Sequence, residues 1–383
     1  MAAEGGILVV NAGSSSIKLK LFGADLAERL SGSATEIGGE GRLSLGATDR
    51  AASLPDHRAA LAALIEAMAA EGVSVSTLTA AGHRVVHGGE TLTKTVRVTP
   101  SVETAIEAAA PLAPLHNPHN LSAIRALAAL APGLAQFATF DTAFHATNPE
   151  VARRYALPET PETAGIRRYG FHGTSYRSLV DRWSALTGTA LPRRLLALHL
   201  GNGASLCAIE EGRSVATTMG YSPLEGLTMG TRVGTIDANA VLDLAERHGI
   251  DRTRRLLNHE SGLLGLGGAS DMRALSAADN DEARFAQSHF AYWAVRHAGS
   301  MIAAMGGLDA VAFTGGIGEN DAWIRHRILQ GLAPFGVTFN EQANRASETR
   351  LDAPGSAVMV AIVPAAEEAQ IAREALALME PVR

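Results

Sequence analysis

The stretch ILVVNAGSSSIKLKLF, residues 7–22, decides the fold that the sequence predicts. Residues 7–10 are aliphatic or β-branched and predict a buried strand. Residues 11–16 are small or polar, and beyond them apolar residues alternate with Lys18, Lys20 and Phe22, which predicts a second strand. The two strands form a hairpin. Its tip is either a plain polar turn or a place where backbone N–H groups, three hydroxyls and one lysine can hold a phosphate.

A second copy of this pattern lies in LLALHLGNGASLCAI, residues 195–209, where Ser205 aligns with Ser16. The separation is about half the chain, which indicates one supersecondary unit used twice. A third glycine-rich turn, TGGIGEN at 314–320, follows the apolar residues 311–313 and predicts close backbone approach to a ligand. The chain contains no Gly-Lys dipeptide, which excludes a Walker A loop, and residues 315–318 do not fit GxGxxG.

Composition limits the classes of function. A chain of 383 residues with 46% hydrophobic residues predicts roughly two domains, and the net charge of −6 argues against nucleic acid as a main partner. The single cysteine, Cys207, cannot form an internal disulfide and is expected to be a buried thiol in a reducing compartment. With neither a membrane-spanning apolar run nor a basic leader before residue 7, we expect a cytoplasmic protein with no membrane partner.

Periodicity and capping residues predict the remaining elements. Strands are expected at Thr79–Val86, at 136–140 and at Val358–Val363, with two short strands within 23–54, one of them at Arg42–Leu45. Helices are expected at 56–71, 102–110, 118–131, from about Ser175, at 238–248, 252–258, 282–305 and 320–331, and from 367 to about 379. Residues 217–237 are predicted to be irregular, and 262–273 to form a glycine-rich turn.

Three polar residues lie close together in the segment GHRVVHGG, residues 82–89. His83 and His87 are four apart, which on a helix would suggest a metal pair, but the intervening valines and the glycine pair favour a strand end. Arg84 beside the glycine pair could fork onto a carboxylate or a phosphate, and a structural ion pair is the alternative.

Four further residues suggest ligand chemistry. Asp141 follows a predicted strand, where an acid can hold a metal or orient a nucleophile; a helix cap is the alternative. His172 precedes a predicted helix, where it could contact an anion. Glu367 and Glu368 open the terminal helix, where acids suit the helix dipole and could equally reach Mg²⁺.

Taken together, the motifs resemble those of the acetate kinase family, within the superfamily of acetate and sugar kinases, heat-shock proteins and actin. Nine motifs occur in that family's order along essentially the whole chain. They are NAGSSSIK (11–18), HRVVHGG (83–89), LAPLHNP (112–118), FDTAFH (140–145), RYGFHGTS (168–175), HLGNG (199–203), MGTR (229–232), SDMR (270–273) and TGGIGE (314–319).

This resemblance implies an α/β fold of two actin-like, ribonuclease H-like domains (βββαβαβα) with an active-site cleft between them. Residues 1–147, with a C-terminal helix at about 368–383 packed back on them, would form the first domain, and 148–367 the nucleotide-binding and dimerisation domain. The implied reaction is reversible, direct in-line transfer of the ATP γ-phosphoryl group to acetate, giving acetyl phosphate and ADP. It implies Mg²⁺, for which Mn²⁺ could substitute, and a homodimer.

The resemblance also implies roles for single residues. The catalytic residues would be Asp141, His172 and Arg232. Those for acetate would be Arg84, Val86, Leu115, His116, Phe171 and Pro223. Those for the nucleotide would be Lys18, His199, Leu200, Gly201, Asn202, Gly203, Asp271, Met272, Arg273, Gly315, Gly316, Ile317, Gly318 and Glu319. The metal would be held by Asn11 and Glu367.

The chain also departs from the family pattern. Ala365 and Ala366 precede the paired acids where an Asn is usual, Val233 and Thr235 replace small polar or acidic residues, and Tyr176 stands where His is typical. The alternatives are a propionate or butyrate kinase of the same superfamily, or an actin-like ATPase that serves as a binding module. One methylene changes binding by only about 1–3 kcal/mol, so the motifs indicate a short-chain carboxylate kinase more firmly than they indicate acetate.

Overall fold

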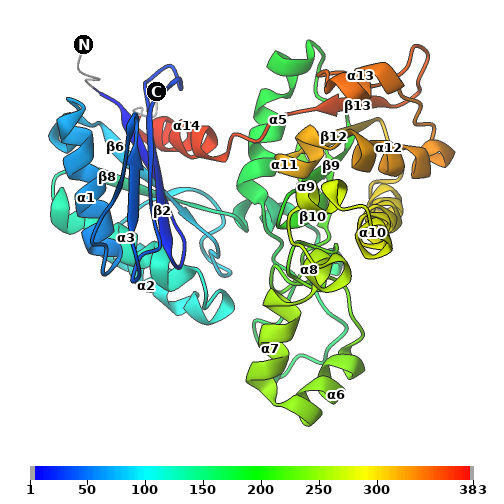
Figure 1. The fold of residues 1–383 in the computed structure, drawn as a ribbon, viewed down its shortest axis with the longest axis horizontal. Helices are drawn as coiled ribbons and strands as arrows, with labels where there is room; N and C mark the ends of the chain where they lie inside the picture. The colour runs from blue at the N-terminus through cyan, green and yellow to red at the C-terminus, as the bar shows by residue number, and fades with distance from the viewer. Residues whose placement is uncertain (1–4, 380–383) are drawn as a thin grey trace. The chain divides into compact units, whose positions relative to one another are not determined.

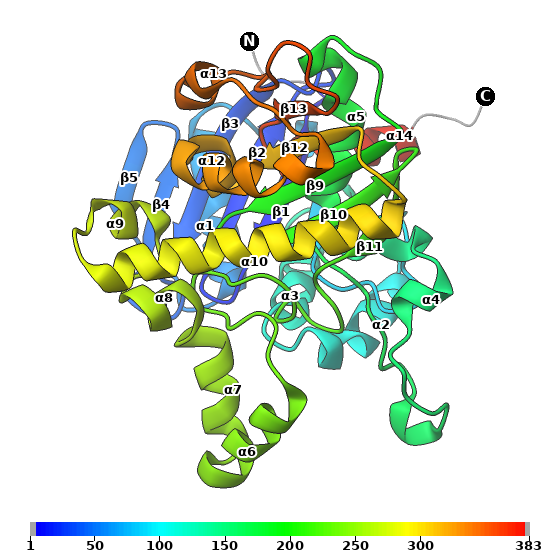
Figure 2. The ribbon, with the colours of Figure 1, turned by 90° about the vertical axis from the view of Figure 1, so that its right-hand side faces the viewer.

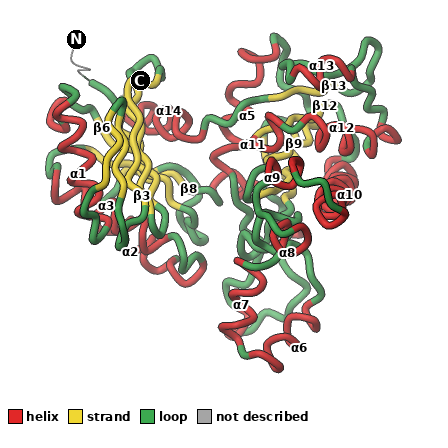
Figure 3. Tube along the Cα trace, viewed as in Figure 1, coloured by secondary structure: helices red, strands yellow, loops and turns green. Residues whose placement is uncertain are grey.

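The computed structural model describes residues 5–379, which divide into two compact units. Residues 5–144 and 366–379 form the N-terminal unit, and 145–365 form the C-terminal unit. Each unit contains one sheet with helices packed on it (Figures 1 and 3). Within residues 5–379, no helix has the length and apolar character needed to span a bilayer.

The N-terminal unit is built on an eight-stranded sheet in the order β5-β4-β3-β2-β1-β6-β8-β7. Its strands are β1 (Ile7–Ala12), β2 (Ser16–Phe22), β3 (Glu28–Thr35), β4 (Arg42–Leu45), β5 (Thr48–Ala51), β6 (Ala80–Val85), β7 (Val96–Arg97) and β8 (Ala135–Phe140). Strands β1 and β2 pair antiparallel, which confirms the predicted hairpin, while β1, β6 and β8 run parallel. The strand expected at Arg42–Leu45 is confirmed as β4, but the expected number of two strands within 23–54 was wrong, because three form there.

Helices cover both faces of this sheet. Helices α1 (His57–Ala70) and α3 (Asn117–Leu130) lie on one face and α14 (Glu367–Met379) on the other; α2 (Pro100–Ala108) contacts α3 (Figure 1). The period-two alternation of β1 explains this, since Leu8 and Val10 join the α1 core while Ile7 and Val9 join the α14 core. The side chain of Asp56 caps α1 by accepting from the Ala59 N–H.

A five-stranded sheet in the order β11-β10-β9-β12-β13 forms the C-terminal unit. Its strands are β9 (Arg194–Leu200), β10 (Ala204–Glu210), β11 (Arg213–Thr217), β12 (Ala310–Thr314) and β13 (Met359–Ile362). Order and direction match β3-β2-β1-β6-β8, because β9–β10–β11 is an antiparallel meander and β9, β12 and β13 are parallel. The predicted repeat is therefore a repeat of topology. Cys207 on β10 is buried as expected, and burial raises the pKa of its thiol to about 12.

Ten α-helices complete the C-terminal unit. They are α4 (Glu150–Arg153), α5 (Gly173–Thr187), α6 (Ala238–His248), α7 (Ile250–His259), α8 (Gly262–Gly267), α9 (Met272–Ala277), α10 (Asp281–Met305), α11 (Gly315–Asn320), α12 (Ala322–Gly331) and α13 (Glu341–Ala346). Helix α10 lies along β9, β10 and β11, and α6 and α7 extend away from this sheet (Figure 2).

Short 3₁₀ helices occur in both units, at η1 (Val75–Thr77), η2 (Ala110–Leu112), η3 (Ala143–Thr147), η4 (Pro161–Thr163) and η5 (Ala333–Phe335).

Two predicted glycine-rich turns were wrong. Residues 262–273 contain α8 and the start of α9, and 314–320 contain α11. Glycine is a poor helix former, but local contacts support these short helices. The Asp271 side chain accepts from the Arg273 N–H at the start of α9, and Glu319 Oε1 accepts from the Gly315 N–H within α11.

Candidate active site

In the N-terminal unit, chemically active side chains gather at the carboxyl ends of the parallel strands β1, β6 and β8. Val10 on β1 is opposite His83 on β6, so Asn11 lies level with Arg84. Alternation places both on the face that α14 covers, where Val9 and Gly82 also lie. Ligand sites of α/β sheets commonly lie at this end of the strands.

Arg84 forms a bidentate, hydrogen-bonded ion pair with Asp141. Its Nε donates to Oδ1 at 3.1 Å and Oδ2 at 3.0 Å, and its Nη2 donates to Oδ2 at 2.6 Å. The Asp141 side chain is 2% exposed and the Arg84 side chain 24%. Burial disfavours charge on Arg84, but Asp141 and Glu367 outweigh it and raise the pKa of Arg84. A buried carboxylate thus orients a charged guanidinium that keeps a solvent-accessible surface, so the contact has the form of the ion pair that the sequence left as an alternative.

Glu367 is the first residue of α14, and its Oε2 lies 4.0 Å from Arg84 Nε. Burial raises the pKa of Glu367 to about 7; Arg84 works against this shift, while Asp141 and Glu368 add to it. The neighbouring Glu368 lies 3.9 Å from Lys20 Nζ. Near neutral pH the Glu367 carboxyl group can therefore bind either a proton or a cation.

Two other predicted residues of this unit, Lys18 and Asn11, lie at the same edge of the sheet. Lys18 pairs across the hairpin with Asn11 and has an exposed side chain. The carboxamide of Asn11 and the carboxylate of Glu367 supply the oxygen donors that Mg²⁺ prefers. Within residues 5–379 no group of three or more His, Cys, Asp or Glu could hold a metal ion alone. Mg²⁺ is usually held by one or two carboxylates together with water and phosphate oxygens, and the donors present fit that type of site.

The predicted acetate residues fall in both units. Val86 is buried and its N–H donates to Asn120 Oδ1 at 3.1 Å, Leu115 is half exposed, and His116 immediately precedes α3. All three belong to the N-terminal unit, whereas Phe171 and Pro223 belong to the C-terminal unit. In that unit the buried Phe171 accepts, through its carbonyl, a hydrogen bond from His145 Nε2 at 2.9 Å.

In the C-terminal unit, His172 stands immediately before α5 in the left-handed conformation, with φ of +59°. Its Nδ1 lies 2.9 Å from Ser205 Oγ, and its ring stacks on His199 with centroids 4.1 Å apart. A non-glycine residue in this conformation costs of order 1–3 kcal/mol, a cost that is often found at functional sites. The strained backbone and the stacked ring together fix the direction of the His172 side chain.

Gly203 lies between His172 and Arg232. A Cβ at this glycine would be 3.2 Å from His172 Nε2 and 3.7 Å from Arg232 Nη1. Arg232 comes from the predicted irregular segment, and its Nη1 donates to the Pro223 carbonyl at 3.3 Å. The glycine thus leaves open a space that an imidazole and a guanidinium both face, which suits an anion.

A groove of about 1230 Å³ in the C-terminal unit brings together three predicted nucleotide segments. It is lined by Gly201 and Asn202 after β9, by Asp271, Met272 and Arg273 at the start of α9, and by Gly316 and Ile317 of α11. The same groove is also lined by Ser270, Ser276, Ala277, Asn320, Asp321, Ala322 and Trp323. The other predicted nucleotide residues of this unit do not line it: His199, Leu200, Gly203, Gly315, Gly318 and Glu319.

The sequence of the chain matches the family model described as the acetokinase family over residues 6–373. The chain belongs to the acetokinase family. An acetate kinase of Leifsonia xyli subsp. xyli is 43% identical over 388 aligned residues, which cover 97% of this chain and 98% of that protein.

Solved structures of acetokinase relatives share the fold. The crystal structure of Porphyromonas gingivalis acetate kinase superposes with a TM-score of 0.92 at 35% identity, covering 98% of this chain and all of that one. A propionate kinase from Francisella tularensis subsp. tularensis also gives 0.92 at 34% identity, covering 97% and 98% of the two chains. These likenesses confirm the predicted family and the mixed α/β fold with two sheets.

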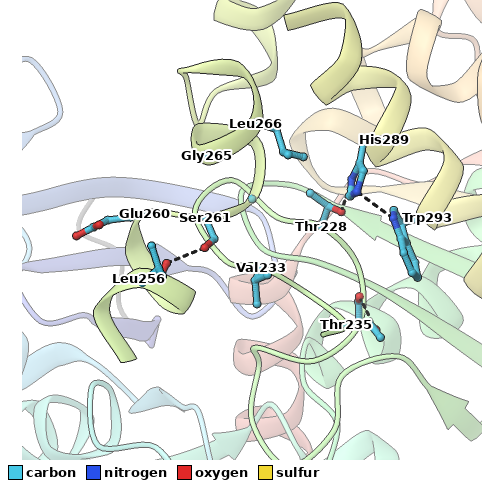
Figure 4. A pocket seen from close by; sticks show the side chains of 12 residues that line it. Thr228, Val233, Thr235, Leu256, Glu260, Ser261, Gly265, Leu266, His289 and Trp293 are labelled. Atoms are coloured by element: carbon cyan, nitrogen blue, oxygen red, sulfur yellow. Dashed lines mark hydrogen bonds between the residues drawn. The ribbon is translucent and has the colours of Figure 1, made fainter. Parts of the chain in front are cut away.

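A second pocket, with a volume of about 400 Å³, lies beside the segment that contains Arg232 (Figure 4). It was not predicted from the sequence. Val233 and Thr235, which the resemblance marks as departures from the family pattern, both line it. Among the other residues that line it, Trp293 Nε1 donates to His289 Nε2 at 3.0 Å, and His289 Nδ1 lies 3.0 Å from Thr228 Oγ1. Because the indole can only donate, His289 carries its proton on Nδ1 and donates to Thr228.

Proposed function

We propose that this protein transfers the γ-phosphoryl group of ATP to acetate, reversibly and directly, giving acetyl phosphate and ADP. The observation that carries the proposal is the groove in which three glycine- and polar-rich segments from distant parts of the C-terminal unit meet. Exposed backbone and polar side chains on such segments are suited to a nucleotide. The choice of acceptor is supported by acetokinase relatives, whose names include acetate kinase.

Acetate is ionised at neutral pH and needs no strong base to become a nucleophile. Its carboxylate oxygen would attack the γ-phosphorus, a new P–O bond would form, and the bond to the bridging oxygen of ADP would break. Catalysis then consists of positioning and of neutralising charge on the moving phosphoryl group.

In the N-terminal unit, we assign Arg84 to the carboxylate of acetate and to the phosphoryl oxygens. Asp141 would act by holding the guanidinium in place through the forked contact. Val86, Leu115 and His116 of this unit are assigned to acetate as the resemblance implies, with Val86 and Leu115 placed against its methyl group. A forked arginine presents its donors in a plane that matches a carboxylate.

In the C-terminal unit, we assign Arg232 and His172 to the oxygens of the transferred phosphoryl group. Both side chains face the space beside Gly203. Phe171 and Pro223 of this unit are assigned to acetate because the resemblance implies it. Removing one donor of this kind typically lowers kcat by about 10²–10³.

We assign Asn11 and Glu367 to a Mg²⁺ ion that accompanies the nucleotide, with Mn²⁺ as a substitute. When bound, this ion would neutralise charge on the phosphate oxygens. The protein's contribution is the pair of oxygen donors at the edge of the sheet, with Lys18 as an added positive charge. Ala365 and Ala366 stand where the acetokinase pattern usually has an Asn, so this chain has one side-chain donor fewer beside Glu367.

The test is ATP-dependent acyl phosphate formation, trapped with hydroxylamine, for acetate, propionate and butyrate. Acetate should give the highest kcat/KM, with little ATP hydrolysis in the acceptor-free control. Butyrate leading would overturn the substrate but keep the mechanism. ATP hydrolysis that no carboxylate affects would favour the ATPase binding module instead.

Propionate is the alternative acceptor with a specific observation in its favour, because a propionate kinase is as similar in fold as an acetate kinase. An apolar pocket separates the two acids by only about 1–3 kcal/mol per methylene, or about 10- to 200-fold. Comparable kcat/KM values for the two acids would make the protein a short-chain acyl kinase without a single preferred acceptor.

We further propose that the protein is a cytoplasmic homodimer formed through the C-terminal unit. Leu242 on α6, Ile250 at the start of α7, and Phe285 and Tyr292 on α10 are 58–67% exposed. Large exposed apolar side chains commonly mark a contact surface, and Phe285 and Tyr292 share one face of α10 because they are seven residues apart. Sedimentation of the parent and of Leu242→Glu with Tyr292→Glu tests this: the parent should be a dimer and the double variant a monomer.

A further inference from the structure

Three side chains of the C-terminal unit form a continuous hydrogen-bonded series that ends at His172. The Tyr176 hydroxyl lies 2.5 Å from Ser205 Oγ, and Ser205 Oγ lies 2.9 Å from His172 Nδ1. Tyr176 and Ser205 are both fully buried. Tyr176 is also one of the positions at which this chain departs from the acetokinase pattern.

Which atom donates in each hydrogen bond of this series follows from the state of Tyr176, the residue farthest from His172. Burial raises the pKa of Tyr176 well above its ordinary value, so the phenol keeps its proton. Tyr176 therefore remains a hydrogen-bond donor, and its proton is directed at Ser205 Oγ, the partner 2.5 Å away. A serine hydroxyl that accepts from Tyr176 has its own proton available for the next acceptor in the series, His172 Nδ1.

We propose that Tyr176 and Ser205 are positioning residues that hold His172 as the tautomer protonated on Nε2. Nε2 is the ring atom that faces the space beside Gly203 and Arg232. His172 would then present an N–H donor to a phosphoryl oxygen without needing to be an imidazolium. The inference rests on the proposed function, in which His172 contacts the transferred phosphoryl group.

Since the ring of His172 is held in place, the main property that can still vary is which ring nitrogen carries the proton. The left-handed conformation of His172 and its stacking on His199 fix the ring plane. His199 is itself held by a separate contact, because its Nδ1 lies 2.9 Å from Ser175 Oγ. With the ring fixed, the other tautomer would present a lone pair to an anionic oxygen, which is repulsive.

The expected effect on catalysis is smaller than loss of the imidazole. Removing a phosphoryl or oxyanion donor typically costs about 10²–10³ in kcat. Mixed tautomers keep part of the donor population, so Tyr176→Phe and Ser205→Ala should each lower kcat about tenfold. If the donor acts mainly in the transition state, the KM values for ATP and acetate should stay within about twofold.

The first test is histidine side-chain ¹⁵N NMR of the full-length, unliganded protein, with the His172 signals assigned by their loss in His172→Gln. In the parent, Nε2 should be the protonated nitrogen and Nδ1 the acceptor. In Tyr176→Phe and Ser205→Ala the two shifts should move toward each other, as expected for mixed tautomers. Thr187→Ala is the matched control: it removes a buried hydroxyl from the same helix, where its contacts are with Trp183 and Thr189, and it should leave the His172 signals unchanged.

Kinetics of the same variants complete the test. A shifted tautomer together with a tenfold lower kcat supports the proposal. A parent His172 protonated on Nδ1, signals unchanged in both variants, or changed tautomers with unaltered kcat would each overturn it. Since the NMR measurement needs no substrate, an inactive parent protein would refute the proposed function without being confused with failure of the positioning role.

Discussion

At the scale of single residues, the forked pair Arg84–Asp141 connects fold and chemistry. The sequence predicted that both residues matter, because Arg84 lies at a strand end beside a glycine pair and Asp141 follows a predicted strand. Their pairing could not be predicted, since it depends on β6 and β8 being neighbours in the sheet. The consequence is that Arg84 is a partly exposed cation whose orientation is fixed by a side chain that is 2% exposed.

Arg84→Ala should lower the rate of acyl hydroxamate formation by about 10²–10³, the range for loss of one charge-stabilising donor. It also leaves Asp141 buried without its main ion-pair partner, so a lower melting temperature is expected as well. The matched control is Arg42→Ala, which removes an arginine from an ion pair with Asp49 that is 63% and 50% exposed in the same unit. That variant should keep both activity and stability, since exposed pairs contribute about 0–1 kcal/mol. Near-normal turnover of Arg84→Ala would refute the role assigned to it.

The buried histidines predict a pH dependence of stability. Burial lowers the pKa of His83 to about 4, while its ordinary value is 6.5; its Nε2 donates to Gln136 Oε1 at 2.6 Å. Below pH 6.5 the unfolded chain takes up a proton that the folded chain refuses until about pH 4, so stability is lost as pH falls through this window. The slope for one such group is up to about 1.4 kcal/mol per pH unit.

Urea unfolding of the parent and of His83→Gln, each at pH 7.5 and 5.5, tests this. The parent should lose more free energy of unfolding between the two pH values than the variant, by about 1.4 kcal/mol. His87, whose pKa burial also lowers to about 4, remains in both proteins and serves as an internal reference. Equal losses in parent and variant would show that His83 titrates normally in the folded state.

At the scale of elements, sequence patterns predicted most strands and long helices but failed where glycines are dense. The hairpin of β1 and β2 follows from alternation, and α10 follows from long helical periodicity. Helices α8 and α11 were assigned to turns because Gly262, Gly265, Gly315 and Gly316 carry little helix propensity. Contacts outside the local pattern support α11, which packs against β9 and β12. Such tertiary support is invisible in a window of sequence.

Close packing of α14 on the N-terminal sheet depends on Gly82. A Cβ at this position would lie 2.6 Å from Ile371 Cγ2, which is buried in the interface with the helix. Gly82→Ala should therefore destabilise the protein by about 1–3 kcal/mol, the usual cost of overpacking a core. Because Glu367 begins the displaced helix, the KM for Mg²⁺·ATP should rise as well.

The control for this variant is Gly133→Ala, which adds the same methyl group where no atom lies within 4 Å. Its melting temperature and its KM should match those of the parent. If Gly82→Ala melts with the parent in differential scanning calorimetry, then α14 adjusts without cost and the close approach is not what limits this position.

At the scale of the whole molecule, the duplication of one sheet order in the two units is the main organising feature. It could be predicted from sequence because the hairpin residues repeat around Ser16 and Ser205. Strand β4 matches the strand predicted at Arg42–Leu45, whereas β5 could not be predicted, since its residues are polar and give a weak strand signal. The groove residues from α12, Trp323 among them, were also missed, because no motif marks them and only the packing of α12 beside α11 brings them to the groove.

The location of the groove in one unit predicts which backbone amides a bound nucleotide should protect. All the groove residues belong to the C-terminal unit, so ADP should protect that unit's backbone amides from hydrogen exchange first. At 100 times its Kd, a ligand that binds only the folded state adds about 2.7 kcal/mol of stability. Peptides that cover 270–277 and 316–323 should therefore exchange more slowly with ADP, while peptides that cover β4 and β5 serve as the control and stay unchanged. Sulfate at the same ionic strength should give no such protection. Protection confined to the N-terminal unit would place the nucleotide elsewhere and remove the observation on which the proposed function depends.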